Sequence, residues 1–168
     1  MVEVGLLDPD ERIELIGGEL VPMSPKGAQH EVLKNMLLAA IIRQVSTDWI
    51  TAIETTYRLS SSTYLEPDIV VFPRRVRFSG LRGYEAELVI EIAETSLAYD
   101  LGRKATLYAS FGIRELWVID ARTRLTTVHR DPDRNGYRSV VKHPEEDILE
   151  AAFVPGLTLS LSNLDLPE

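Results

Sequence analysis

Hydrophobic and polar residues alternate in short runs near the start of the chain and then change to a helical spacing. Two apolar runs flank Gly17-Gly18 in the segment ERIELIGGELVPMSP, which predicts a β-hairpin that ends at Pro22 and Pro25. From about residue 28 to residue 45 apolar side chains recur every three or four residues, which predicts an amphipathic helix. Its expected buried stripe is Val32, Leu33, Met36, Leu37, Ala40 and Ile41.

The next part of the chain is rich in β-branched residues, which favour strands. Three strands are expected, at about residues 53–59, 66–72 and 87–94. A second helix is predicted over residues 97–111, with Gly112 as its left-handed cap.

A further strand is expected at residues 114–120. Residues 123–130 and 137–143 look like a hairpin that turns over residues 131–136, where Asn135-Gly136 is a turn signal. The apolar tail VPGLTLSLSNLDL is expected to pack back on the body. This order predicts an α/β or α+β fold, in which helices flank a mixed sheet and extra hairpins lie near the ends. A length of 168 residues fits one domain over residues 1–168.

Composition narrows the classes of function. Without cysteine the chain has no disulfide and no thiolate metal site, and a cytoplasmic location is expected. No apolar run approaches ~18 residues and the start lacks the features of a signal peptide, so we expect no membrane partner. A net charge of −8 argues against a passive nucleic-acid coat, because such a coat needs a basic face. It leaves room for an enzyme in which a metal ion supplies the positive charge.

Two acids stand inside the predicted strands, Asp68 in PDIVVF and Glu91 in LVIEIA. Burying an unpaired carboxylate is costly, so such a group usually loses its charge or finds a cation. Two carboxylates on neighbouring strands can share a divalent ion, and Mg²⁺ binds well to one or two carboxylates plus water and phosphate. We expect both side chains on one face of the sheet. The alternative is that each acid lies at a strand end, in water or beside an arginine.

Other candidate residues have a structural alternative that is at least as good. Asp100 and Lys104 are one helical turn apart and could form an ordinary surface ion pair. A helix that returns across the sheet could instead aim Lys104 at the carboxylates, where a lysine can orient water or stabilise charge. His30 could cap the first helix or join the site, and Glu19 could be a third acid near the metal or an exposed strand residue.

A cluster of arginines follows the Asp68 strand. Its members could contact phosphate or lie on a solvated loop, and neither interpretation is favoured. They are Arg74, Arg75, Arg77 and Arg82.

Several stretches resemble the Uma2 (DUF820) family of the PD-(D/E)XK superfamily. They are ERIELIGGELVPMSP, EPDIVVF, the closing VPGLTLSLSNL and, as the longest, LVIEIAETSLAYDLGRKATLYASFGIRELWVID. The resemblance implies a restriction-endonuclease-like fold, with Asp68 and Glu91 as the metal-binding acids and with Mg²⁺ or Mn²⁺ as cofactor. The superfamily lysine lies two residues after the second acid, where this chain has Ala93, so Lys104 is the matching candidate. Glu94-Thr95 departs from the Ser-Pro that is usual in the family, and the extra carboxylate could bind the metal too or could spoil the site.

The resemblance implies a metal-dependent endonuclease that hydrolyses phosphodiester bonds of nucleic acid, with DNA as the first choice of substrate. Two alternatives stay open: a nuclease acting on RNA or an unusual DNA structure, and an inactive nuclease-fold module that serves in binding or assembly. A homodimer is expected, because cutting both strands of a duplex needs two sites and two-fold pairing is the commonest closed assembly.

Overall fold

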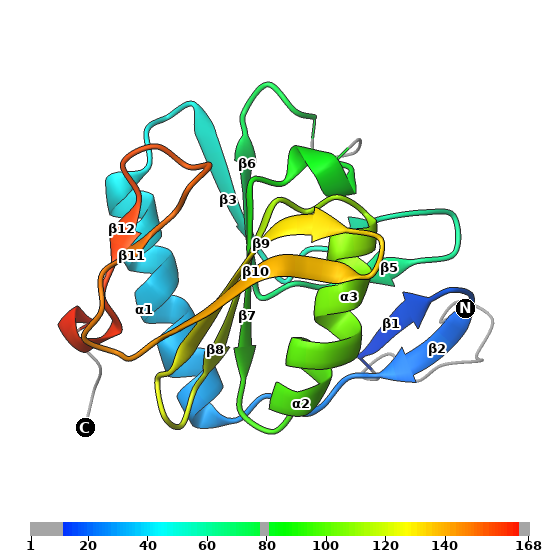
Figure 1. The fold of residues 1–168 in the computed structure, drawn as a ribbon, viewed down its shortest axis with the longest axis horizontal. Coiled ribbons are helices and arrows are strands. Elements are labelled where there is room, and N and C mark those ends of the chain that lie inside the picture. Colours follow the sequence, from blue (N-terminus) through cyan, green and yellow to red (C-terminus); the bar gives the residue numbers. More distant parts are fainter. Residues whose placement is uncertain (1–11, 78–80, 165–168) are drawn as a thin grey trace.

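The structure is a computed structural model that describes residues 12–77 and 81–164. Over these residues a six-stranded mixed sheet forms the centre, in the order β10-β9-β8-β7-β6-β3, with β7 and β8 parallel and the other neighbours antiparallel (Figure 1). Its strands are β3 (Trp49–Ile53), β6 (Ile69–Pro73), β7 (Leu88–Ala93), β8 (Glu115–Asp120), β9 (Thr126–Asp133) and β10 (Gly136–His143).

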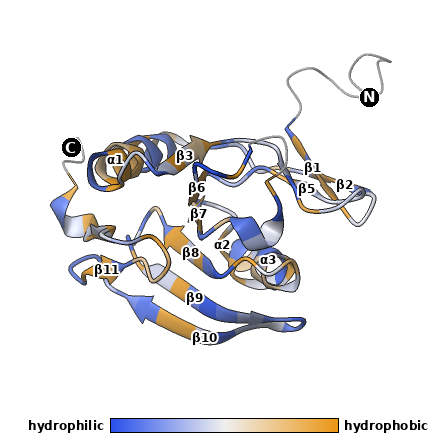
Figure 2. Ribbon diagram, turned by 90° about the horizontal axis from the view of Figure 1, so that it is seen from above, coloured by the Kyte–Doolittle hydropathy of each residue, from blue (hydrophilic) through white to orange (hydrophobic). Residues whose placement is uncertain are grey.

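Helices cover both faces of this sheet, as Figure 2 shows from above. Helix α1 (Ala28–Gln44) packs Leu33, Leu37 and Ile41 on one face, and the C-terminal segment lies beside it. A second helical segment packs on the opposite face. It consists of α2 (Leu97–Tyr99), a π-helical turn η4 (Asp100–Lys104) and α3 (Ala105–Ser110). The mixed sheet between helices confirms the predicted fold class.

The opening hairpin forms as predicted, from β1 (Ile13–Ile16) and β2 (Glu19–Pro22). Gly17 and Gly18 make its turn with positive φ angles of 60° and 90°, which glycine adopts without steric cost. The hairpin continues into a small sheet with β5 (Tyr64–Leu65) and β4 (Tyr57–Arg58). This sheet lies beside the helical segment that contains α3 (Figure 1).

The strand predicted over residues 53–59 is wrong in its extent. The chain forms β3 earlier, at Trp49–Ile53, and leaves the sheet at Glu54, whose φ angle is 44°. Such an angle is uncommon for a residue with a side chain, and nothing in the residue pattern signals it. The strand predicted over residues 66–72 likewise starts later, at Ile69, so that Asp68 precedes it.

The second helix and the later hairpin differ less from the prediction. The predicted helix 97–111 is interrupted by the π-helical turn and ends before Gly112, which has a φ angle of 79° and is the predicted cap. In the later hairpin, β9 lies three residues further along the chain than predicted, β10 begins one residue earlier, and the turn is confined to Arg134 and Asn135.

The C-terminal segment packs back on the body, as predicted. It contains β11 (Leu149–Glu150), β12 (Thr158–Leu159) and the 3₁₀ turn η5 (Leu161–Asn163), and it contributes buried leucines to the core around α1. A further 3₁₀ turn, η3 (Gly83–Glu85), precedes β7. Residues 78–80 of the predicted basic loop and residues 165–166 of the predicted tail lie outside the described residues. None of the helices described is both long and apolar enough to span a membrane.

Candidate active site

Asp68 and Glu91 face each other across the junction of β6 and β7. The antiparallel register pairs Ile69 with Ile90 and Val70 with Val89, which sets Asp68 opposite Glu91. Side chains alternate along each strand, so both acids lie on the face that carries the core around α3. Both acids are buried, at 3% and 4% exposure. The expected shared face is therefore observed, while the metal-binding role of the two acids stays a prediction.

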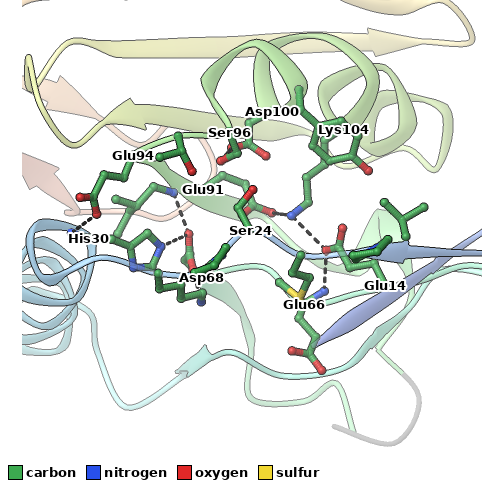
Figure 3. Close-up of a pocket in the computed structure, with 18 of the residues that line it drawn as sticks. Glu14, Ser24, His30, Glu66, Asp68, Glu91, Glu94, Ser96, Asp100 and Lys104 are labelled. Atoms are coloured by element: carbon green, nitrogen blue, oxygen red, sulfur yellow. Dashed lines mark hydrogen bonds and ion pairs between the residues drawn. The ribbon is translucent and has the colours of Figure 1, made fainter. Parts of the chain in front are cut away.

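Lys104 reaches Glu91 from the helical segment above the sheet. Its Nζ lies 3.0 Å from Glu91 Oε1 and 3.0 Å from Glu14 Oε1 (Figure 3). Both carboxylates are almost fully buried. The π-helical turn widens the helix locally, so that Asp100 and Lys104 both point inward; such turns occur often at functional sites. The ion-pair partners of Lys104 are thus Glu14 and Glu91, not Asp100 on its own helix.

His30 and Lys26 contact Asp68 from the opposite side. His30 Nε2 lies 3.0 Å from Asp68 Oδ2, which also accepts a hydrogen bond from the backbone N–H of Ile92 at 2.8 Å. Lys26, in the loop between β2 and α1, donates to Asp68 Oδ1 at 2.6 Å. The structure therefore places His30 in the site rather than at a helix cap. Lys26 was not among the predicted site residues, since a lysine beside Pro25 carries no signal of burial.

The opening hairpin contributes Glu14 rather than Glu19. Glu19 lies outside the pocket, with 76% of its side chain exposed, and pairs with Arg103 at 3.5 Å. Glu14 is 3% exposed and accepts a hydrogen bond from the backbone N–H of Glu66 at 3.1 Å. The alternation of β1 could have indicated Glu14, because it shares the buried face with Ile16.

Glu94 and Asp100 line the same pocket with different partners. Glu94 Oε2 accepts a hydrogen bond from the backbone N–H of His30 at 3.3 Å, so this carboxylate lies at the positive end of α1. Gly27 makes that approach feasible, because a Cβ there would meet Glu94 Oε2 at 2.2 Å. Asp100 accepts a hydrogen bond from the Ser96 hydroxyl at 2.5 Å.

A pocket of about 420 Å³ joins these groups. The predicted residues that line it are His30, Asp68, Glu91, Glu94, Asp100 and Lys104, to which the structure adds Glu14, Lys26, Glu66 and Tyr99. Figure 3 shows Lys104 between Glu91 and Glu14, and His30 beside Asp68. The arginines of the basic loop do not line this pocket, and Arg74, Arg75 and Arg77 are exposed.

The two opposed acids differ in their affinity for a proton. Burial would raise the pKa of Asp68, but the hydrogen bond and charge of His30 and the charge of Lys26 lower it to about 2. Burial raises the pKa of Glu91 to about 8, and the charge of Lys104 offsets this only in part. Burial alone would lower the pKa of Lys104, yet Glu91, Glu14 and Asp100 raise it overall. The surrounding carboxylates therefore favour the charged form of Lys104, and burial makes Glu91 a weaker acid than Asp68.

The donor set fits a divalent ion of the magnesium type. Within residues 12–77 and 81–164, no group of three or more histidine, aspartate or glutamate side chains is arranged to hold a metal. Mg²⁺ needs only one or two carboxylates, because water and substrate phosphate complete its shell. Glu91 Oε1 accepts a hydrogen bond from Tyr108 and lies 3.0 Å from Lys104 Nζ. The Glu91 carboxylate lines the pocket together with Asp68, so both acids face the same cavity.

Comparisons with known proteins agree with this geometry. Residues 3–162 match the model of the Uma2 family, described as "Putative restriction endonuclease". The fold is similar to the crystal structure of "a putative nuclease belonging to DUF820" from Anabaena variabilis, with a TM-score of 0.76 and 16% sequence identity. The similarity covers 96% of this chain and 93% of that one. A comparison with curated proteins finds no match.

Proposed function

Because the chain belongs to the Uma2 family, whose description is that of a restriction endonuclease, we propose that it is a metal-dependent nuclease that hydrolyses phosphodiester bonds. One observation carries the proposal: Asp68 and Glu91 lie opposite each other in a pocket, and a charged lysine lies 3.0 Å from one of them. A structural ion pair would need neither the second buried acid nor the open pocket.

In this proposal Asp68 and Glu91 hold Mg²⁺ or Mn²⁺. The ion would supply positive charge at the scissile phosphate and acidify a water molecule. His30 and the Ile92 N–H fix the orientation of Asp68, because both donate to its Oδ2. Tyr108 fixes Glu91 through its hydroxyl, which donates to Oε1 at 2.5 Å. The two ligands are therefore oriented before anything binds.

Lys104 would contribute electrostatic stabilisation to the reaction. Glu91 and Glu14 keep its ammonium charged, and its position at the pocket wall lets it orient the attacking water or stabilise the developing negative charge. Lys104 would thus replace the superfamily lysine from a helix, since the usual lysine position, two residues after Glu91, holds Ala93.

We propose DNA as the first substrate to test. The net charge of −8 weakens binding to a long duplex, so contacts outside the metal site must come from local basic residues such as Arg75 and Arg77. A panel of duplex DNA, single-stranded DNA and RNA, each with Mn²⁺ at several salt concentrations, tests this choice. Cleavage of RNA alone would contradict it and would support the RNA nuclease instead.

The alternative is an inactive module that keeps the fold for binding or assembly. Lys26 favours it, because this lysine already neutralises Asp68 and stands where a cation is expected. The two proposals differ in divalent-ion binding: a saturable heat of Mn²⁺ binding supports the nuclease, and its absence supports the module.

We also propose that the nuclease acts as a homodimer, since two sites are needed to cut both strands of a duplex and two-fold assemblies are the commonest. Light scattering at micromolar concentration tests this directly, and the mass of a monomer would contradict it.

A further inference from the structure

Lys26 lies between two carboxylates at the edge of the pocket. Its Nζ is 2.6 Å from Asp68 Oδ1 and 2.6 Å from Glu54 Oε1. Only 11% of its side chain is exposed, although it belongs to the loop that joins β2 to α1. A lysine held in this way is more than a surface charge, because one of its partners, Asp68, is almost completely removed from water.

Among the described residues, Lys26 is the partner of Asp68 Oδ1, whereas Oδ2 has two other partners, the Ile92 N–H and His30. A cation that binds Asp68 through Oδ1 therefore meets Lys26. Glu91 lies opposite Asp68 on the neighbouring strand and lines the same pocket. A divalent ion that used both acids would therefore compete with the ammonium of Lys26.

Glu54 gives Lys26 a second anchor. This carboxylate follows β3 at a positive φ angle and also accepts a hydrogen bond from Lys34 at 2.6 Å. Lys34 is 3% exposed, and its Nζ is further held by Glu31 at 2.8 Å. Lys34 contacts the same oxygen of Glu54 as Lys26 and helps to hold that carboxylate in place, so Lys26 can give up Asp68 and still keep a partner for its charge.

We propose that Lys26 is a built-in counter-ion of Asp68, which a divalent ion displaces, and that it therefore sets the affinity of the site for that ion. The inference rests on the proposed function in so far as Asp68 is a metal ligand. It adds a specific residue outside the Asp68, Glu91 and Lys104 set, and it predicts an effect on binding that is separate from catalysis.

Calorimetric titration with Mn²⁺ tests the inference on three proteins: the natural chain, Lys26→Met and Lys34→Met. Removing the charge of Lys26 removes the competitor for Asp68 Oδ1, so Lys26→Met should bind Mn²⁺ at least ~10-fold more tightly. Lys34→Met is the matched control, because it removes the same charge and the same Glu54 contact but touches Asp68 nowhere. Its affinity should change by less than about threefold. If Lys26→Met does not fold by thermal melting, Lys26→Gln takes its place.

Each outcome separates the two proposals. If the natural chain binds Mn²⁺ and Lys26→Met binds it no more tightly, the counter-ion inference is overturned and the metal site stands. An equal gain in Lys34→Met also overturns the inference, because the effect would then be one of overall charge. If Lys26→Met alone binds the ion, the inference is supported and the nuclease proposal fails for the natural chain. If neither protein binds it, both proposals fail.

Discussion

The Nζ of Lys104 lies 3.0 Å from Glu91 Oε1, although the two residues come from a helical turn and a strand. The π-helical turn at Asp100–Lys104 creates this contact by directing both of its ends toward the sheet. A regular surface helix pair would leave both residues in water, whereas Lys104 is 4% exposed. The contact links the helix to the carboxylates on which the proposed chemistry depends.

Replacing Lys104 by methionine should lower cleavage in a single-turnover assay by roughly 10²-fold or more, because one preorganised charge is lost from the transition state. Mn²⁺ binding should persist, since the ligands remain. Arg103→Met is the control: it removes a neighbouring charge whose partner is the exposed Glu19, and its activity should equal that of the natural chain. Equal activity in Lys104→Met would leave the residue with a structural role only.

Two glycine substitutions test the packing around the helical segment. Gly102 lies within the π-helical turn and a Cβ there meets no atom within 4 Å, so Gly102→Ala should stabilise the fold by about 0.5–1 kcal/mol. Gly83→Ala should destabilise it by about 1–3 kcal/mol, because its Cβ would lie 2.3 Å from the carbonyl oxygen of Phe111. Urea denaturation measures both. A loss of stability in Gly102→Ala would contradict the open space at that position.

Glu54 should make stability depend on pH. Burial would raise its pKa, but Lys26 and Lys34 lower it to about 2 from an ordinary value of 4.5. The stabilisation is thus present above pH 4.5 and is lost as the pH falls toward 2. Glu54→Gln should cost about 1 kcal/mol at pH 7, a modest value because a third of the side chain is exposed. Urea denaturation measures the difference in the free energy of unfolding between the natural chain and Glu54→Gln, which should become smaller from pH 7 to pH 3. A difference that stays constant would rule out this ion-pair origin.

Glu115 is the buried acid that we assign to stability rather than chemistry. It is 0% exposed, and its oxygens accept hydrogen bonds from Trp117, from Arg130 and from the Ala152 N–H. Glu115→Ala should destabilise the protein by about 3 kcal/mol, since it leaves the Trp117 and Ala152 N–H groups without these acceptors and Arg130 without its ion-pair partner.

The control for Glu115 is Glu87→Ala, which removes an acid whose partner Arg114 is half-exposed. It should cost less than about 1 kcal/mol. Thermal melting of the two variants measures the difference, and equal losses would contradict the structural role of Glu115.

The two central acids could be predicted from the sequence, because burying a carboxylate within a run of β-branched residues costs free energy unless a cation or a hydrogen-bond donor pairs with it. Asp68 and Glu91 both meet that test, and strand alternation was enough to set them on one face. Helical spacing predicted the stripe of α1 in part: Leu33, Leu37 and Ile41 are buried, whereas the other three predicted members are only half-buried.

Other parts of the site depend on tertiary contacts that no local pattern carries. The choice of Glu14 over Glu19 is set by the way the hairpin pairs with β5, through Leu15 and Tyr64. Lys26 is buried against Asp68 and Glu54, and Glu54 has a positive φ angle, which is uncommon for a residue with a side chain. The π-helical turn also escapes prediction, since its residues have the same spacing as an ordinary helical turn.

Cleavage of a DNA substrate in the presence and absence of Mn²⁺, by the natural chain and by Glu91→Ala, tests the nuclease proposal most directly. We expect cleavage that requires the ion, that a chelator abolishes and that falls by at least ~10²-fold in the variant, because one of the two ligands is then missing. Thermal melting shows whether the variant is folded. Cleavage that is independent of the ion, or equal in a folded Glu91→Ala variant, would contradict the assignment of Asp68 and Glu91 as the catalytic metal site.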